Sequence, residues 1–308
     1  MLRQPCSVAA IMASMCRECR SEANRILSRV GLVTGEKAEI EIMAFFASPT
    51  GGGKVPELPL MREIQLLLRD IPPSQQSVVP APRWPLDVHS GLRKEAPRVL
   101  QFSGHTARGS LCFHSVAAEG LASLPDWRGW HDVLGRNQAE RLEGVVLNAC
   151  SSLRIAVSIV RHKSTSHLQV VCWATKVESS AATCFMHGFY KCIAEEIGCP
   201  IDRAFAAGCD RFNACFATGD PDEYLHPPGH DHEDKYDPSC PGCRPPCAGI
   251  PLLLSKRSWR GVLEKVEAER NCYCKQTPCA CPLSWIHTEL ARPDEELLDY
   301  TAYSGSWA

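Results

Sequence analysis

Short apolar runs alternate with helical patterns along most of this chain, and this alternation restricts the possible folds more than any other feature. Runs of strand length occupy residues 40–49, 97–105, 142–150 and 168–175. Segments with apolar residues at helical spacing occupy 57–71, 151–163, 178–197 and 201–217. The strand runs are apolar at consecutive positions, which is typical of strands buried on both faces of a parallel sheet. The sequence therefore predicts an α/β fold, with a mostly parallel sheet and helices on both faces.

Shorter segments complete the predicted organisation. We expect a helix over 7–30, a short strand over 77–82, a short helix over 86–96, a hairpin return at 110–115, surface loops with a helical turn over 126–138, a last strand at 250–254 and a helix over 258–270. The predicted domains are an N-terminal helical segment at 1–38, a main domain at 39–254 and a C-terminal helix with a Cys-rich tail at 255–308. An irregular Cys/His-rich insertion occupies about 219–249.

Charge and hydropathy exclude two classes of function. The 308 residues carry 33 Lys and Arg against 35 Asp and Glu, for a net charge of -2, so the chain lacks the excess of basic residues that a large phosphate-binding face needs. No apolar run approaches the roughly 18 residues of a membrane span, and the first residues contain only a short, interrupted apolar stretch. We expect a soluble, cytoplasmic protein that binds neither nucleic acid nor membrane.

Cysteine is unusually frequent, at 18 residues. In a short secreted chain this frequency would predict a disulfide framework, but this chain is long and many of its cysteines lie inside apolar segments, where a thiol packs as a small apolar group. Disulfides are therefore the second interpretation. The clustered exceptions are Cys16 and Cys19, then Cys240, Cys243 and Cys247, then Cys272, Cys274, Cys279 and Cys281.

The insertion at about 219–249 contains candidate metal ligands. They are His226, His230, His232, Cys240, Cys243 and Cys247. The spacing of Cys240 and Cys243 suits one edge of a tetrahedral zinc site, and Cys247 with a histidine would supply the other ligands. A long loop with few apolar residues needs something other than core burial to order it. A structural zinc ion is one interpretation, and a surface loop with incidental His and Cys residues is the other.

Two of the predicted strands end in side chains that can react. The run at 97–105 ends in His105, and the run at 142–150 ends in Cys150. Catalytic groups of open α/β sheets gather beyond the carboxyl ends of the strands, so neighbouring strands would bring the thiol and the imidazole to one edge. A thiolate is a nucleophile, and an imidazole within reach can accept the thiol proton and later protonate a leaving amine. Taken singly, Cys150 is more often a packed core thiol and His105 a loop residue bonded to a backbone carbonyl.

The order of these segments resembles the CHAT domain, a branch of the caspase-like cysteine peptidases that includes separase. The matching segments, over roughly residues 39–254, are IMAFFASP, ELPLMREIQLLLRDI, RVLQFSGH, GVVLNACSS, VVCWATKVESSAATCFMHGFYKCI and IDRAFAAG. Cys150 follows His105 by 45 residues, close to the spacing of about 50 in caspases, although the caspase signature around the cysteine is absent. The resemblance implies a caspase-like fold and thiol-dependent cleavage of a protein or peptide, with no cofactor required for catalysis.

The resemblance also assigns roles to single residues. It implies Cys150 as nucleophile, His105 as its partner, and backbone groups of Gly104, Thr106 and Cys150 around the oxyanion. The family usually has Gly where this chain has Thr106, and Ser151 and Ser152 also depart from its pattern, so a side chain at position 106 is expected to weaken catalysis. Glu178 lies where the family often has Asp, which would favour a basic substrate residue.

Two functions of different classes follow from the sequence. The first is a caspase-like cysteine endopeptidase that acts through His105 and Cys150 and an acyl-enzyme. The second is a weak or inactive CHAT-fold interaction module with a structural zinc site, favoured by Thr106 and by the residues after Cys150. Any regulator would act in trans, because no helical repeats are visible beside the main domain.

Overall fold

The computed structural model of the chain describes residues 39–49, 57–107, 110–115, 122–123, 130–135, 141–174, 177, 179–217 and 249–268. The expected helix over 7–30, the candidate metal ligands from His226 to Cys247 and the tail from residue 271 lie outside this part. The domain limits proposed from the sequence stay predictions. In the described part, every helix is too short or too polar to cross a membrane.

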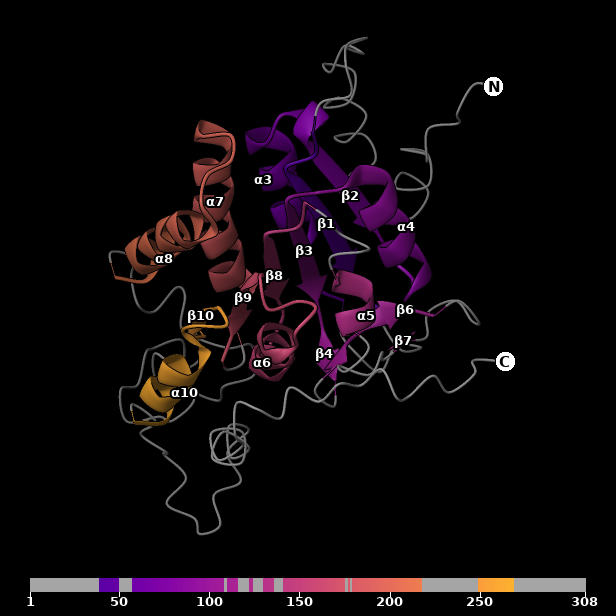
Figure 1. Cartoon of the computed structure of the whole chain (residues 1–308). Helices are drawn as coiled ribbons and strands as arrows, with labels where there is room; N and C mark the ends of the chain where they lie inside the picture. The colour runs from indigo at the N-terminus through magenta and orange to yellow at the C-terminus, as the bar shows by residue number, and fades with distance from the viewer. Residues whose placement is uncertain are drawn as a thin grey trace, which may run out of the picture. The chain divides into compact units, whose positions relative to one another are not determined.

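A six-stranded sheet forms the centre of the fold, in the order β10-β9-β8-β3-β1-β2 (Figure 1). Its strands are β1 Ile42–Ala47, β2 Gln76–Pro80, β3 Val99–Gly104, β8 Gly144–Asn148, β9 Gln169–Trp173 and β10 Pro251–Leu254. Neighbouring strands are parallel, except that β10 runs antiparallel to β9. Two small hairpins accompany the sheet: β4 Thr106–Ala107 pairs with β5 Ser110–Leu111, and β6 Phe113–His114 with β7 Ala122–Ser123. The hairpin return expected at 110–115 is thus confirmed.

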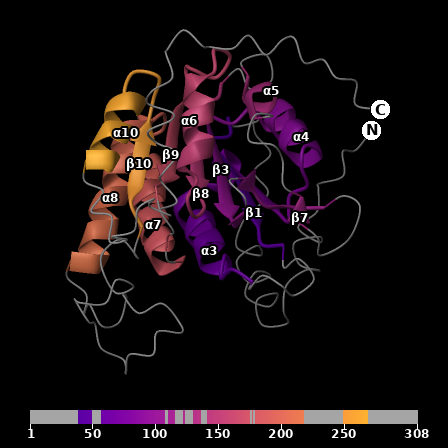
Figure 2. The ribbon, with the colours of Figure 1, turned by 90° about the horizontal axis from the view of Figure 1, so that it is seen from below.

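Helices cover both faces of the sheet, as the sequence predicted. They are α3 Met61–Asp70, α4 Leu86–Glu95, α5 Trp130–Leu134, α6 Leu153–Arg161, α7 Ser179–Glu195, α8 Ile201–Ala217 and α10 Trp259–Ala268, and a 3-10 turn, η1, spans Pro73–Gln75. Buried residues of α4, α5, α6 and α10 pack in one core cluster, and those of α3, α7 and α8 pack in another. Figure 2 shows these two groups of helices along opposite sides of the sheet. The predicted mostly parallel α/β fold is confirmed.

The first strand shows why consecutive apolar residues were needed. All six residues of β1 are buried. Met43 and Phe45 pack in the cluster with α4, α5 and α6, whereas Ile42 and Phe46 pack in the cluster with α3 and α7. Because successive side chains of a strand point to opposite faces, a strand between two helical layers must be apolar at every position.

The helical turn expected within 126–138 is present, but it is buried and not at the surface. Residues 130–134 form α5, and Trp130, Val133 and Leu134 are buried in the core. The indole of Trp130 lies 4.6 Å from the ring of Trp84 and 5.9 Å from that of Phe113, measured between ring centroids. These aromatic partners come from distant parts of the chain, so the stretch gains its burial from tertiary contacts that its local composition does not reveal.

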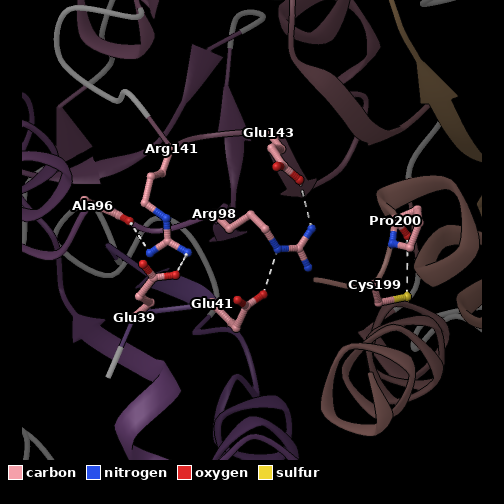
Figure 3. Close-up of polar contacts among 8 residues, drawn as sticks. All are labelled: Glu39, Glu41, Ala96, Arg98, Arg141, Glu143, Cys199 and Pro200. Carbon is pink, nitrogen blue, oxygen red and sulfur yellow. Dashed lines mark hydrogen bonds and ion pairs between the residues drawn. The ribbon is translucent and has the colours of Figure 1, made fainter. Parts of the chain in front are cut away.

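Charged residues, not apolar ones, occupy the amino ends of the central strands. Arg98 precedes β3 and is only 5% exposed. Its Nε donates to Glu41 before β1 at 2.7 Å, and its Nη1 donates to Glu143 before β8 at 3.1 Å (Figure 3). Arg141 pairs with Glu39 nearby at 2.7 Å. These ion pairs mark the end of the sheet opposite to the candidate site. The pair of Arg98 with Glu41 is buried, and Arg98 would be strongly destabilising there without this carboxylate.

Candidate active site

His105 and Cys150 follow the carboxyl ends of two adjacent parallel strands. The strands β3 and β8 are paired directly, with Ser103 opposite Asn148 at the last register position. His105 comes directly after β3, and Cys150 comes in the turn between β8 and α6. The sequence argument required these two strands to be neighbours, and they are.

Both residues line one small cavity of about 50 Å³. Besides His105 and Cys150, residues from the start of α3 and the start of α7 line it, and they include Leu58, Leu60, Glu63, Ser179, Ala182 and Thr183. Helix α3 follows β1 and helix α7 follows β9, so both of these lining segments come directly after strands of the sheet. The cavity therefore lies where α/β sheets generally bind ligands, beyond the carboxyl ends of the strands.

The thiol of Cys150 is partly exposed and contacts the backbone just before α7. Its Sγ lies 3.4 Å from the N–H nitrogen of Val177, which donates to it, and 3.5 Å from the carbonyl oxygen of the same residue. The carbonyl can accept a bond from the thiol, and the N–H can stabilise a thiolate. Helix α7 begins two residues later at Ser179, and the positive end of its dipole also favours a negative charge. The backbone of Val177 therefore places one hydrogen-bond donor and one acceptor beside the sulfur.

The turn that presents Cys150 is held by Ser152. This serine is fully buried, and its hydroxyl donates to the carbonyl of Leu147 at 3.0 Å while accepting from the N–H of Trp173 at 3.1 Å. It thereby ties the end of β8 to the end of β9. Ser151, which lies between Cys150 and Ser152, has a φ of 50°, a left-handed conformation that is uncommon for a residue with a side chain. The backbone thus turns sharply immediately after Cys150.

The two residues beside His105 have specific structural roles. A Cβ atom on Gly104 would lie 2.4 Å from the carbonyl oxygen of Ala47 in β1, so only glycine fits there. The hydroxyl of Thr106 donates to the carbonyl of Cys150 at 2.5 Å. The side chain that was expected to weaken the site therefore links the His105 segment to the Cys150 turn.

A buried carboxylate lies under the cavity. Glu63 of α3 is 3% exposed, and four side chains donate hydrogen bonds to it. They are Ser103 at 2.5 Å, Gln101 at 2.6 Å, Asn148 at 2.9 Å and Tyr190 at 3.4 Å. Burial raises the pKa of Glu63 from 4.5 to about 7, and the four hydrogen bonds oppose that rise. The carboxyl group thus titrates near neutral pH.

Several other cysteines are poorly suited to react. Burial raises the pKa of Cys112 and of Cys209 to about 11, and it raises that of Cys172 further. Burial and the neighbouring Cys192 raise the pKa of Cys199 to about 12. Because the thiolate is the nucleophile, these four thiols are protonated and unreactive at neutral pH.

The remaining predicted site residues cannot be placed. Glu178 and the six candidate zinc ligands lie outside the described residues. Among the residues that the structure describes, no three His, Cys, Asp or Glu side chains are grouped so as to hold a metal ion. The predicted acidic specificity residue and the predicted zinc site stay predictions.

The network around Glu63 was missed at the level of sequence. Its signal was present, because Gln101 and Ser103 are polar residues at alternate positions of a strand that is otherwise apolar. Polar side chains in a strand buried on both faces need hydrogen-bond partners from the helices above. Glu63 on α3 and Tyr190 on α7 are those partners.

No family model matches this sequence, and no match to a curated protein was found. Two solved structures of gingipain are similar in part. One is a complex of the RgpB pro- and mature domains from Porphyromonas gingivalis, with 11% identity, a TM-score of 0.39, and coverage of 64% of this chain and 48% of that chain. The other is the Arg-specific cysteine proteinase gingipain R, with 13% identity, a TM-score of 0.41, and coverage of 65% and 49%.

This chain spans about half the length of the gingipain chains that it matches. Both TM-scores are below 0.5, so the roles of His105 and Cys150 rest on their own surroundings and not on these matches. The specific resemblance to the CHAT domain is not supported by a family model and stays a proposal.

Proposed function

We propose that this protein is a caspase-like cysteine peptidase in which Cys150 is the nucleophile and His105 the general acid and base. The observation that carries the proposal is that both residues line one cavity beyond the carboxyl ends of adjacent parallel strands. A cysteine with only a packing role and an unrelated loop histidine would have no reason to line the same cavity. The partly exposed sulfur and the N–H of Val177 beside it add support.

The reaction begins with transfer of the Cys150 proton to His105. The sulfur attacks the carbonyl carbon of a peptide bond, and backbone N–H groups near Cys150 and Thr106 are proposed to bind the oxyanion. His105 then gives the proton to the leaving nitrogen, the C–N bond breaks, and a thioester remains on Cys150. Water attacks the thioester and gives a proton to His105, the C–S bond breaks, and the proton returns to the sulfur.

Labelling of the thiol tests the nucleophile first. Incubation of the full chain with a peptidyl acyloxymethylketone should modify Cys150 in preference to the other cysteines, as read by mass spectrometry of the digested protein. His105→Ala should abolish this preference, because the proton acceptor is lost. Cys184 on α7 is another partly exposed thiol, and Cys184→Ala should leave the labelling of Cys150 unchanged.

Cleavage of peptide libraries tests the activity itself. The wild-type protein should process a subset of peptides, and Cys150→Ala should process none. Equal processing by both proteins would refute the proposed function. Selective labelling without cleavage would favour the alternative of an inactive interaction module.

A structural zinc ion in the segment 219–249 is a separate proposal, based on the sequence alone. It predicts about one zinc ion per chain in native mass spectrometry, and loss of that ion on replacing Cys240 and Cys243 with Ser. A chain that purifies without zinc and binds none on addition would end this proposal.

A further inference from the structure

Asn148 connects the buried carboxylate of Glu63 to the Cys150 turn. It is the last residue of β8, two positions before Cys150, and it is only 6% exposed. Its Nδ2 donates to Glu63 Oε2 at 2.9 Å, and its Oδ1 accepts from the indole N–H of Trp173 at 2.8 Å. Both ends of the amide are therefore occupied, which fixes its orientation.

The two oxygens of Glu63 have unequal surroundings. Oε1 accepts from Gln101, Ser103 and Tyr190, whereas Oε2 accepts from Asn148. Gln101, Ser103 and Asn148 each present a hydrogen to the carboxylate, and the single O–H hydrogen of Tyr190 is shared between Glu63 and the nearer Gln101 Oε1 at 2.8 Å. An ionised carboxylate satisfies every one of them, but a protonated carboxyl turns one of its oxygens into a donor.

We propose that Glu63 is a positioning residue for Cys150: its ionised carboxylate holds Asn148, and Asn148 holds the end of β8 from which the thiol enters the cavity. The inference rests on the proposed function only in so far as Cys150 reacts at all. Glu63 and Asn148 line the same cavity as Cys150, so their contact lies within the site.

The charge state of Glu63 makes the role testable by pH. Burial raises its pKa to about 7, so the carboxylate forms across the neutral range. The titratable groups that face Glu63 are Tyr190 from α7 and, across the cavity, His105 after β3 and Cys150 after β8. Burial and the nearby carboxylate raise the pKa of Tyr190 well above its usual value, so it stays a donor throughout. Protonation at Oε2 puts a hydrogen on the oxygen that accepts from the Asn148 amide, and it thereby weakens that contact.

The experiment measures the rate at which iodoacetamide alkylates Cys150 in the full-length chain, by mass spectrometry of the Cys150 peptide, between pH 5.5 and 8.5. The proteins are wild type, Glu63→Gln and the control Glu41→Gln. Glu41 is an equally buried glutamate, but it pairs with Arg98 at the opposite end of the sheet. Dividing each wild-type rate by the variant rate at the same pH removes the pH dependence that the two proteins share.

The ratio of wild type to Glu63→Gln should rise about tenfold from pH 5.5 to 8.5, with a midpoint near 7, as expected for one hydrogen bond to a buried charge. The ratio of wild type to Glu41→Gln should be flat. A flat ratio for Glu63→Gln overturns the inference, and so does an equal rise in both ratios.

A second variant guards against misfolding of Glu63→Gln. Asn148→Ala removes the same contact from the other side, so its ratio should show the same rise, and the double variant should add no more than either change alone. Additive effects would overturn the inference. If the peptide libraries are not cleaved but the ratio rises, the proposed peptidase activity fails and the positioning role stands; if they are cleaved and the ratio is flat, the reverse holds.

Discussion

The hydroxyl of Thr106 donates a hydrogen bond to the carbonyl oxygen of Cys150, at 2.5 Å. The residue after the candidate histidine is thereby joined to the candidate nucleophile itself. The link crosses from β4 to the turn after β8, two segments that the strands β3 and β8 bring together. The relative positions of the imidazole and the thiol consequently depend on this hydroxyl.

Replacement of Thr106 tests whether its side chain supports or hinders the site. Thr106→Val keeps the shape but leaves the Cys150 carbonyl without this donor, and we expect a loss of about 1 kcal/mol in the free energy of unfolding. We also expect slower labelling of Cys150. Thr106→Ser keeps the hydroxyl and should behave like the wild type. If Thr106→Gly labels faster than the wild type, the side chain obstructs the site, as the family pattern suggested.

The fold was predictable because its central strands are buried on both faces. The runs that became β1 and β3 are apolar or small at nearly every position, which few other structures require. The burial of α5 was not predictable, because its apolar residues Trp130, Val133 and Leu134 span little more than one turn. Its burial depends on aromatic rings that lie far away in the sequence.

The candidate site was predictable only to the level of its reacting side chains. His105 and Cys150 end strands, and the rule for parallel sheets places strand ends at one edge. Glu63 escaped notice because its hydrogen-bond partners are 38 to 127 residues away in the chain. A charged residue on an amphipathic helix is usually solvated, and only the packed sheet reveals that this one is buried.

Ser152 should be among the most important residues for the stability of the Cys150 turn. Ser152→Ala leaves the carbonyl of Leu147 and the N–H of Trp173 buried without this partner, so we expect a loss of about 2–4 kcal/mol in the free energy of unfolding. Urea denaturation measures the change. Ser166→Ala removes an exposed hydroxyl that bonds to the carbonyl of Lys163, and it should cost less than about 0.5 kcal/mol.

Glu63 should make the protein less stable as the pH rises. Its folded pKa of about 7 exceeds the ordinary value of 4.5, so the folded state binds more protons between these two pH values. Stability is therefore lost as the pH rises from 4.5 through 7. Relative to Glu63→Gln, the wild type should lose about 3 kcal/mol over that interval, which urea denaturation at pH 4.5, 6 and 7.5 measures. A difference between the two proteins that does not change with pH would contradict this expectation.

His131 should have the opposite effect and destabilise the protein in acid. The ring is 8% exposed and stacks on His162, with 3.9 Å between the ring centroids, and its Nε2 lies 3.2 Å from the hydroxyl of Ser158. Burial, together with the charge of His162, lowers the pKa of His131 from 6.5 to about 3. The unfolded chain thus binds a proton that the folded chain excludes, and stability falls as the pH drops below 6.5.

The loss between pH 6.5 and 5 should be about 2 kcal/mol from His131 alone. His131→Phe keeps a ring against His162 and removes this titration. As the pH falls from 6.5 to 5, the wild type should therefore lose about 2 kcal/mol of unfolding free energy that the variant keeps. His89 on α4 is a half-buried histidine, and His89→Phe is the matched control that should leave the acid dependence unchanged. Ser158 loses its hydrogen-bond partner in His131→Phe, so the variant is less stable than the wild type at pH 7. The change of the unfolding free energy with pH, and not its absolute value, therefore decides the outcome.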